Sequence, residues 1–105
     1  MMSLHDAVRA LVAHGARHVG SARFERVGTD SRSVVPAQLF VALRGERFDG
    51  HTFLAAAARA GAAAAMVDAA WAAANPDAGE GLPLLIVDDS RRALGTLASA
   101  WRARF

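Results

Sequence analysis

Residues 27 to 53, VGTDSRSVVPAQLFVALRGERFDGHTF, place a polar cluster on each side of one short apolar run. The run Leu-Phe-Val-Ala-Leu at 39–43 has the length of a strand and no polar position, which is typical of a strand covered on both faces. Residues 28–37 and 44–50 are rich in Gly, Asp, Ser and Pro, the residue types that form turns. The stretch therefore predicts a buried strand with a turn at each end.

Helix and strand patterns alternate along the rest of the chain. Ser3 can cap a helix that ends at Gly15, and Ser90 can cap a helix that runs to the end of the chain. Between them the pattern predicts a weak strand at 23–27, a helix at 51–60, a strand at 62–67, a helix at 69–74, a surface loop at 77–83 and a strand at 84–87. This order predicts an α/β fold, with helices packed on a mixed, mostly parallel sheet.

Length and composition exclude several classes of protein. A chain of 105 residues forms one domain and is too small for two lobes with a cleft between them. It has no cysteine and no apolar run of 18 residues, and it does not begin with a cationic leader. We therefore expect a cytoplasmic protein that does not span a membrane.

The charge of the chain is weaker than its pI suggests. The sequence pI is about 11.0, yet the formal net charge is only +2. The pI is high because all 12 basic residues are arginine and the chain has no lysine, cysteine or tyrosine, so almost nothing titrates between the histidines and the arginines. The arginines are scattered and interleaved with acids, whereas a nucleic-acid surface needs them clustered. We expect no nucleic-acid binding.

The sequence favours neither a metal site nor a catalytic centre. His14 and His18 are separated by Gly15 and lack a carboxylate at a matching spacing, so we expect two exposed surface histidines. Ser31, His51 and Asp30 or Asp49 supply the residue types of a catalytic triad, but no Gly-x-Ser-x-Gly motif presents the serine. The chain contains no lysine and therefore no complete P-loop. We expect no catalytic residue in this chain.

The two turns around the strand at 39–43 are the best candidates for a ligand site, because strand ends hold loop polar atoms in place in α/β proteins. Ser31 offers a hydroxyl, and the backbone of 45–47 offers donors and acceptors for the edge of a base. Arg32 and Arg47 carry forked donors suited to phosphate oxygens. The alternative is that Asp30 and Asp49 simply close turns and that the arginines are solvated.

The chain resembles the N-terminal domain of the Mur ligases, which build the peptide stem of the peptidoglycan precursor in the cytoplasm. The resemblance is carried by Thr-Asp-Ser-Arg (29–32), Pro36, Leu-Phe-Val-Ala-Leu (39–43) and Gly-Glu-Arg-Phe-Asp-Gly-His (45–51). It continues through Phe53, Ala-Gly-Ala (60–62), Leu-Ile-Val (85–87) and 93–102, and so covers nearly the whole chain. It implies a three-layer domain.

The resemblance also implies the rest of the enzyme. Mur ligases have three domains: the first holds the uridine diphosphate end of the substrate, the central P-loop domain binds ATP and Mg²⁺, and the third positions the amino acid. This chain ends about where the central domain would begin. We therefore expect a monomeric recognition domain, inactive alone, whose partners are UDP-N-acetylmuramoyl-tripeptide and the missing central and C-terminal domains. No metal or cofactor is expected in the domain itself.

Within the family, GERFDGH (45–51) and ALGTLASAWR (93–102) are similar to the ligase that adds D-alanyl-D-alanine to the tripeptide substrate. One alternative is the preceding ligase, which adds the third stem residue; it shares the Asp-Ser-Arg and Asp-Gly-His elements but usually differs between Gly45 and Asp49. A second alternative is a stand-alone interaction module that kept the fold without the nucleotide site.

The resemblance suggests a role for each candidate residue. Thr29 and Ser31 would contact uracil or ribose, and Glu46, Arg47 and Phe48 would form the second wall of the uridine site. Arg32 would either assist the diphosphate or brace its own loop. The remaining candidates would shape the loops: Gly45 and Gly50 through backbone conformation, Asp30 and Asp49 as loop formers, and His51 as a helix cap.

Overall fold

The computed structural model describes residues 1–76 and 81–105. Its strands are β1 (Met2–Ser3), β2 (Arg17–Val19), β3 (Arg23–Phe24), β4 (Arg26–Gly28), β5 (Gln38–Val41), β6 (Ala64–Asp68) and β7 (Leu84–Val87). Its α-helices are α1 (Leu4–Ala10), α2 (Leu54–Arg59), α3 (Ala69–Ala74) and α4 (Ser90–Arg104), and its 3-10 helices are η1 (Val12–His14), η2 (Ser31–Ser33) and η3 (Gly50–Phe53). No helix in this described part of the chain is long and apolar enough to cross a membrane.

A five-stranded sheet in the order β2-β7-β6-β5-β4 forms the centre of the molecule. The strands β4, β5, β6 and β7 are parallel, and β2 pairs antiparallel with β7 at one edge. A separate two-stranded ribbon joins β1 to β3. The prediction of a mixed, mostly parallel sheet is confirmed.

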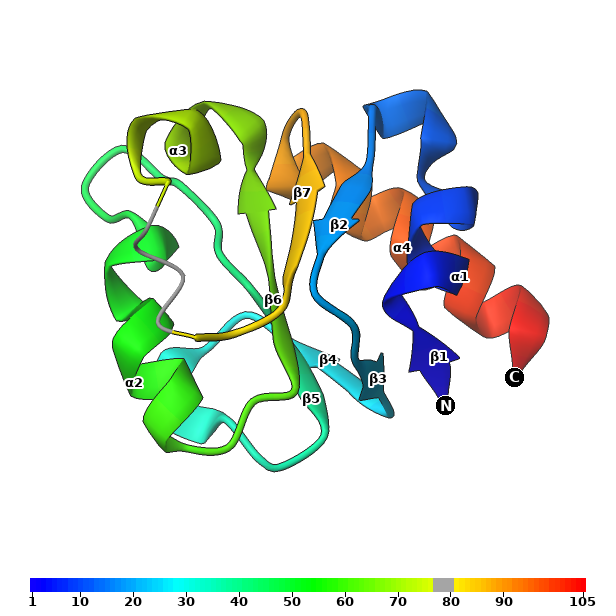
Figure 1. Ribbon diagram of the computed structural model, residues 1–105, viewed down its shortest axis with the longest axis horizontal. Helices are drawn as coiled ribbons and strands as arrows, with labels where there is room; N and C mark the ends of the chain where they lie inside the picture. The colour runs from blue at the N-terminus through cyan, green and yellow to red at the C-terminus, as the bar shows by residue number, and fades with distance from the viewer. Residues whose placement is uncertain (77–80) are drawn as a thin grey trace.

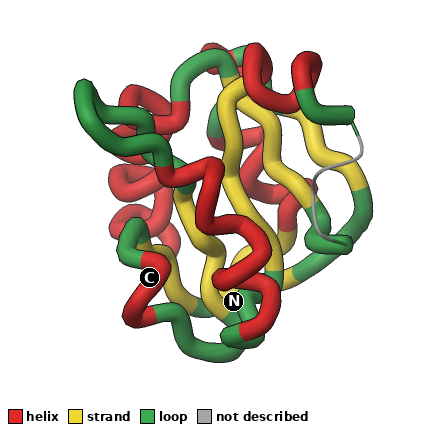
Figure 2. The backbone as a smooth tube through the Cα atoms, turned by 90° about the vertical axis from the view of Figure 1, so that its left-hand side faces the viewer, coloured by secondary structure: helices red, strands yellow, loops and turns green. Residues whose placement is uncertain are grey.

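Helices cover both faces of this sheet, which gives three layers (Figure 1). On one face Leu39, Val41 and Met66 pack with α1 and α4, and on the other Phe40 and Val67 pack with α2 and α3. Neighbouring strand residues point to opposite faces, so a strand buried on both sides needs an unbroken apolar run. Figure 2, seen from the side of α2, shows the strands as a layer behind that helix.

The helix ends follow side-chain capping, with one correction to the sequence prediction. Ser3 caps α1 through a reciprocal capping box with Asp6, and Gly15 adopts a left-handed φ of 63° after η1. The cap of α4 is Asp89, not Ser90: its carboxylate accepts hydrogen bonds from the backbone N–H groups of Arg91 and Arg92. Asp89 precedes Ser90 by one residue and its carboxylate binds the free N–H groups of the first turn, so Ser90 is the first residue of the helix.

Some predicted elements are split in the structure. The strand expected at 23–27 is two short strands in different sheets, because the chain changes partner at Glu25. The helix expected at 51–60 begins as η3 and becomes α-helical only at Leu54. The loop expected at 77–83 lies largely outside the described residues.

His14 corrects the prediction of two exposed histidines. Its side chain is only 12% exposed, its Nε2 lies 2.8 Å from the hydroxyl of Thr96, and its Nδ1 lies 3.4 Å from Asp88. His18 is half-buried, with Nδ1 2.7 Å from the carbonyl oxygen of Gly20. The two histidines therefore contact different parts of the fold and do not share a site.

Candidate functional site

The carboxyl ends of the four parallel strands meet at one edge of the sheet. Residues 29–32 follow β4 and residues 42–50 follow β5, while Asp68 ends β6 and Asp88 follows β7. Loops at this edge present side chains and backbone amides from a rigid base. The fold thus brings both predicted turns to the same edge, although residues 29–32 and 45–48 make no side-chain hydrogen bond to each other within the described structure.

The first turn is closed by Asp30. Its carboxylate accepts from the backbone N–H of Arg32 at 2.9 Å, and both carboxylate oxygens receive the Arg32 guanidinium, at 3.1 and 3.2 Å. The guanidinium, followed by the backbone N–H, holds the pKa of Asp30 below its usual value of 3.8. The Arg32 side chain stays 88% exposed. In this structure Arg32 braces its own loop.

Thr29 is exposed and Ser31 is half-buried, and the described residues supply no hydrogen-bond partner for either hydroxyl. Glu46 and Arg47 are exposed as well, and neither side chain takes part in an ion pair among the described residues. These four side chains therefore keep their polar atoms available to a ligand, as a binding role requires.

The second turn folds back on itself between Arg44 and Asp49, which form an isolated β-bridge. The N–H of Gly45 donates to the carbonyl of Phe48, and the N–H of Gly50 donates to the carbonyl of Leu43, both at 2.7 Å. A Cβ on Gly50 would lie 2.8 Å from the backbone nitrogen of Leu43, so glycine is required there by close approach. Gly45 has neither a left-handed φ nor such a contact, and its expected conformational role is not observed.

A buried histidine anchors this turn to the sheet. The His51 side chain is fully buried, and its Nδ1 lies 2.6 Å from Oδ1 of Asp49. The backbone N–H of Asp68 donates to its Nε2 at 3.1 Å, so Nε2 carries no proton and Nδ1 carries the one given to Asp49. The ring also stacks on Trp71 at 5.1 Å. The cap of η3 is Asp49, and His51 instead joins the turn to β6.

Asp49 and Asp68 extend this network on either side of the histidine. Burial alone would raise the pKa of Asp49, but hydrogen bonds from the backbone and ring of His51 and the nearby charge of Arg44 outweigh burial and hold that pKa below 3.8. Asp68 accepts from the backbone N–H of Ser90 at 2.7 Å. The turn after β5 is thereby tied to the start of α4.

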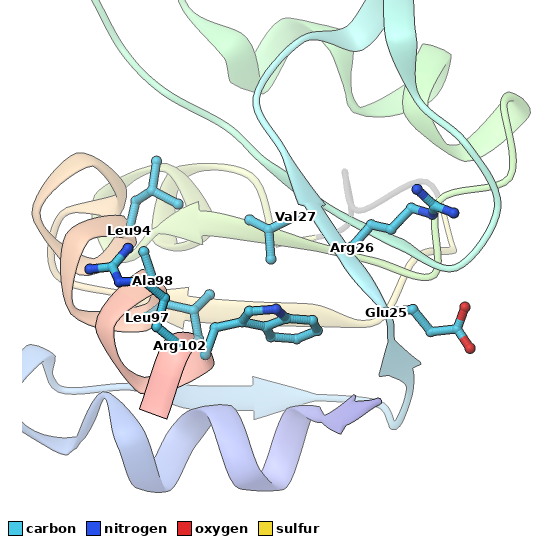
Figure 3. Close-up of a pocket in the computed structure, with 8 residues that line it drawn as sticks. Glu25, Arg26, Val27, Leu94, Leu97, Ala98 and Arg102 are labelled. Atoms are coloured by element: carbon cyan, nitrogen blue, oxygen red, sulfur yellow. The ribbon is translucent and has the colours of Figure 1, made fainter. Parts of the chain in front are cut away.

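Neither of two cavities found among the described residues is lined by Thr29–Arg32 or by 45–48. The first, of about 430 Å³, runs between β4 and α4 and is lined by Val27, Leu94, Leu97, Ala98 and Trp101, with Glu25, Arg26 and Arg102 at its margin (Figure 3). The second, of about 330 Å³, opens beside the β5 turn and is lined by Arg44, Asp68, Ala70, Asp88, Asp89 and Arg91.

The acidic residues of the second cavity accept hydrogen bonds from the backbone. Asp68, Asp88 and Asp89 each accept a hydrogen bond from a main-chain N–H at the start of α4. No group of three or more potential metal ligands occurs among the described residues. The arrangement suits loop support and polar recognition of a ligand.

A comparison with protein families now places the chain. Residues 23–102 match the model described as "Mur ligase family, catalytic domain". The chain belongs to the Mur ligase family.

Individual relatives agree with this assignment. This Mur ligase chain is 40% identical over 116 residues to the UDP-N-acetylmuramoyl-tripeptide--D-alanyl-D-alanine ligase of Treponema pallidum, covering 100% of the chain and 24% of that relative. It is 45% identical over 80 residues to the UDP-N-acetylmuramoyl-L-alanyl-D-glutamate--2,6-diaminopimelate ligase of Streptomyces coelicolor, covering 76% of the chain and 15% of that relative. The chain thus spans about a quarter or less of these relatives.

A solved structure supports the fold. MurF from Acinetobacter baumannii superimposes with a TM-score of 0.69 and 31% sequence identity, over 93% of this Mur ligase chain and 21% of MurF. Both the D-alanyl-D-alanine-adding and the diaminopimelate-adding ligases occur among the relatives. The relatives therefore establish the family but do not distinguish between these two ligases.

Three features of the candidate site were missed by the sequence prediction. Arg44 pairs with Asp49 at 3.3 Å, the backbone N–H of Asp68 donates to His51, and Phe53 places an exposed ring beside Phe48. Asp68 directly follows the strand predicted at 62–67. Because strand ends share one edge of a parallel sheet, this position was the available signal for Asp68. The spacing of Arg44 and Phe53 contains no comparable signal.

Proposed function

We propose that this chain is the domain of a Mur ligase that recognises the uridine diphosphate end of a UDP-N-acetylmuramoyl-peptide. One observation carries the proposal: two separately braced turns at the same sheet edge leave Thr29, Ser31, Glu46 and Arg47 with polar atoms available. The Asp30–Arg32 pair and the Asp49–His51 pair fix the two backbones, so a ligand that bridges them meets an ordered surface.

The proposed parent enzyme is the ligase that adds D-alanyl-D-alanine to UDP-N-acetylmuramoyl-tripeptide. In it, ATP and Mg²⁺ would be held by the remainder of the enzyme, because this chain has no lysine to complete a P-loop. We infer that the domain is a cytoplasmic monomer that binds substrate and catalyses nothing alone. The similarity to the Treponema pallidum ligase over 100% of the chain supports this choice of parent.

A second candidate is the preceding ligase, which adds the third stem residue. The 45% identity to the Streptomyces coelicolor ligase favours it. The sequence that follows Phe105 in the parent gene, expressed together with this chain, distinguishes the two. The full enzyme would couple ATP cleavage either to D-alanyl-D-alanine or to the third stem residue.

A third candidate is an interaction module without nucleotide binding. The apolar cavity between β4 and α4 favours it, since contiguous exposed apolar surface often marks a binding site. Titration of ¹⁵N-labelled protein with UDP separates this candidate from the first. Nucleotide recognition predicts amide shifts at 29–32 and 45–48, whereas an unchanged spectrum at millimolar UDP would contradict it.

A variant pair sharpens this titration. Ser31→Ala removes a hydroxyl at the proposed contact and should weaken UDP binding. Ser99→Ala removes a hydroxyl from the exposed side of α4 and should leave UDP binding unchanged. Equal binding by both variants would remove Ser31 from the site.

A further inference from the structure

The turn after β5 carries an exposed pair of aromatic rings. Phe48 is 50% exposed and Phe53 is 38% exposed, and their ring centroids lie 6.0 Å apart with 31° between the planes. A ring that remains partly in water forgoes the stabilisation that full burial would give. Two such rings in contact at a loop edge therefore indicate a surface that something covers.

The backbone holds both rings in place. The carbonyl of Phe48 closes the turn by accepting from Gly45, and Phe53 is the last residue of η3, directly before α2. Between them, Gly50 packs against Leu43 and His51 is fixed by Asp49 and Asp68. The pair is thus preorganised, so a ligand that covers it would not have to order the loop first.

The surroundings suggest what covers the rings. η2, which contains Ser31, packs against α2, the helix that begins directly after Phe53. Arg47 lies next to Phe48 in the sequence and is exposed, and its forked donors suit phosphate oxygens. An aromatic surface, an arginine next to it in the sequence and a serine on the neighbouring η2 match the parts of a nucleoside diphosphate, which has a base, a ribose and two phosphates.

We propose that Phe53, together with Phe48, forms a stacking platform for the uracil base of the UDP end. This inference rests on the proposed function and adds a residue to it: Phe53 becomes a specificity residue, and Arg47 faces the diphosphate. Stacking of a base on an aromatic side chain contributes about 1–3 kcal/mol, which corresponds to about a 5- to 150-fold change in affinity.

The test compares three phenylalanine variants of the 105-residue chain. Phe53→Ala and Phe48→Ala should each weaken UDP binding at least fivefold. Phe105→Ala removes a ring that is 63% exposed at the far end of α4 and should leave binding unchanged. Phe53→Leu retains apolar bulk without an aromatic face and should also bind UDP more weakly. Circular dichroism establishes that each variant is folded.

Two further readouts identify the base as the occupant. The uracil H5 and H6 protons should move upfield on binding to the wild type, through the ring currents, and this shift should disappear in Phe53→Ala. Binding of inorganic pyrophosphate, which has no base, should be the same in the wild type and in Phe53→Ala.

The outcomes separate the two proposals. If the wild type binds no UDP, nucleotide recognition and the platform are both overturned. If the wild type binds UDP and Phe53→Ala binds it equally well, only the platform is overturned, and another part of the enzyme covers the rings. Equal loss of UDP and pyrophosphate binding in Phe53→Ala would show that the ring shapes the loop and does not stack on the base.

Discussion

The buried His51 network makes a quantitative prediction about stability. His51→Phe keeps a ring of similar size against Trp71 but removes both nitrogen contacts. The N–H of Asp68 then lacks its partner, which costs about 1–3 kcal/mol for a buried donor. Loss of the bond to Asp49 adds about 1 kcal/mol, because that carboxylate is 31% exposed and regains water. We expect a total loss of about 2–4 kcal/mol.

Urea unfolding followed by circular dichroism measures this loss, with His5→Phe as the control. His5 is exposed on α1, so its replacement should change the free energy of unfolding by less than about 0.5 kcal/mol. The backbone amides of 44–50 should also exchange faster with solvent in His51→Phe, because the turn loses its anchor. A His51→Phe protein as stable as His5→Phe would refute the anchoring role.

Two further predictions concern the same turn. Gly50→Ala places a Cβ 2.8 Å from the backbone nitrogen of Leu43 and should lower the free energy of unfolding by about 1–3 kcal/mol. Gly95→Ala, with no atom near its Cβ in α4, should raise the free energy of unfolding by about 0.5–1 kcal/mol. A urea titration that ranks the two variants in the opposite order would contradict the close-approach argument. The pKa of Asp49 is lower in the folded state than its usual 3.8. The stabilising contribution of Asp49 is therefore present above about pH 4 and is lost as the pH falls through the folded pKa. The free energy of unfolding of Asp49→Asn should depend less steeply on pH in the acid range, and an unchanged dependence would count against this assignment.

The parallel core was predictable because each of its strands is a local pattern. Unbroken apolar runs marked β5 and β7, and the predicted bounds 69–74 and 84–87 coincide with α3 and β7. An apolar run of strand length has few alternatives once turn residues flank it. Local composition was therefore sufficient for the centre of the sheet.

The edges of the fold were not predictable in this way. β2 has the sequence Arg-His-Val and exists because it pairs with β7, whose residues lie 65 to 69 positions further along the chain. β1 and β3 have two residues each and are strands only through their mutual pairing. Such elements contain too few residues for a periodic signal, so tertiary contacts determine them.

The candidate site also combines features that local sequence predicts with features that depend on tertiary contacts. The two turns were marked by their residue types, and Asp30 and Asp49 each accept from the backbone N–H two residues ahead. The link from His51 to Asp68 joins residues 17 positions apart, and the contact between Phe48 and Phe53 depends on how η3 leads into α2. Those features follow from the packing of α2 and β6, and no local sequence pattern predicts that packing.

A repeated tripeptide shows why local sequence was insufficient for function. Asp-Ser-Arg occurs at 30–32 and again at 89–91, and in both copies the aspartate accepts from the N–H of the arginine at 2.9 Å. The first copy opens the single 3-10 turn η2, which follows the edge strand β4, and Ser31 stays half-buried. The second opens the 15-residue helix α4, which packs across the sheet and leaves Ser90 only 1% exposed.

The tripeptide therefore determines the turn, and its position in the sheet determines whether its polar atoms can reach a ligand. The second copy is consequently an internal control within the same molecule. UDP should shift the amide signal of Ser31 while leaving that of Ser90 in place. Equal shifts at both serines would mean that UDP binds to the motif wherever it occurs. This result would contradict the proposal that the turns after β4 and β5 form the binding site.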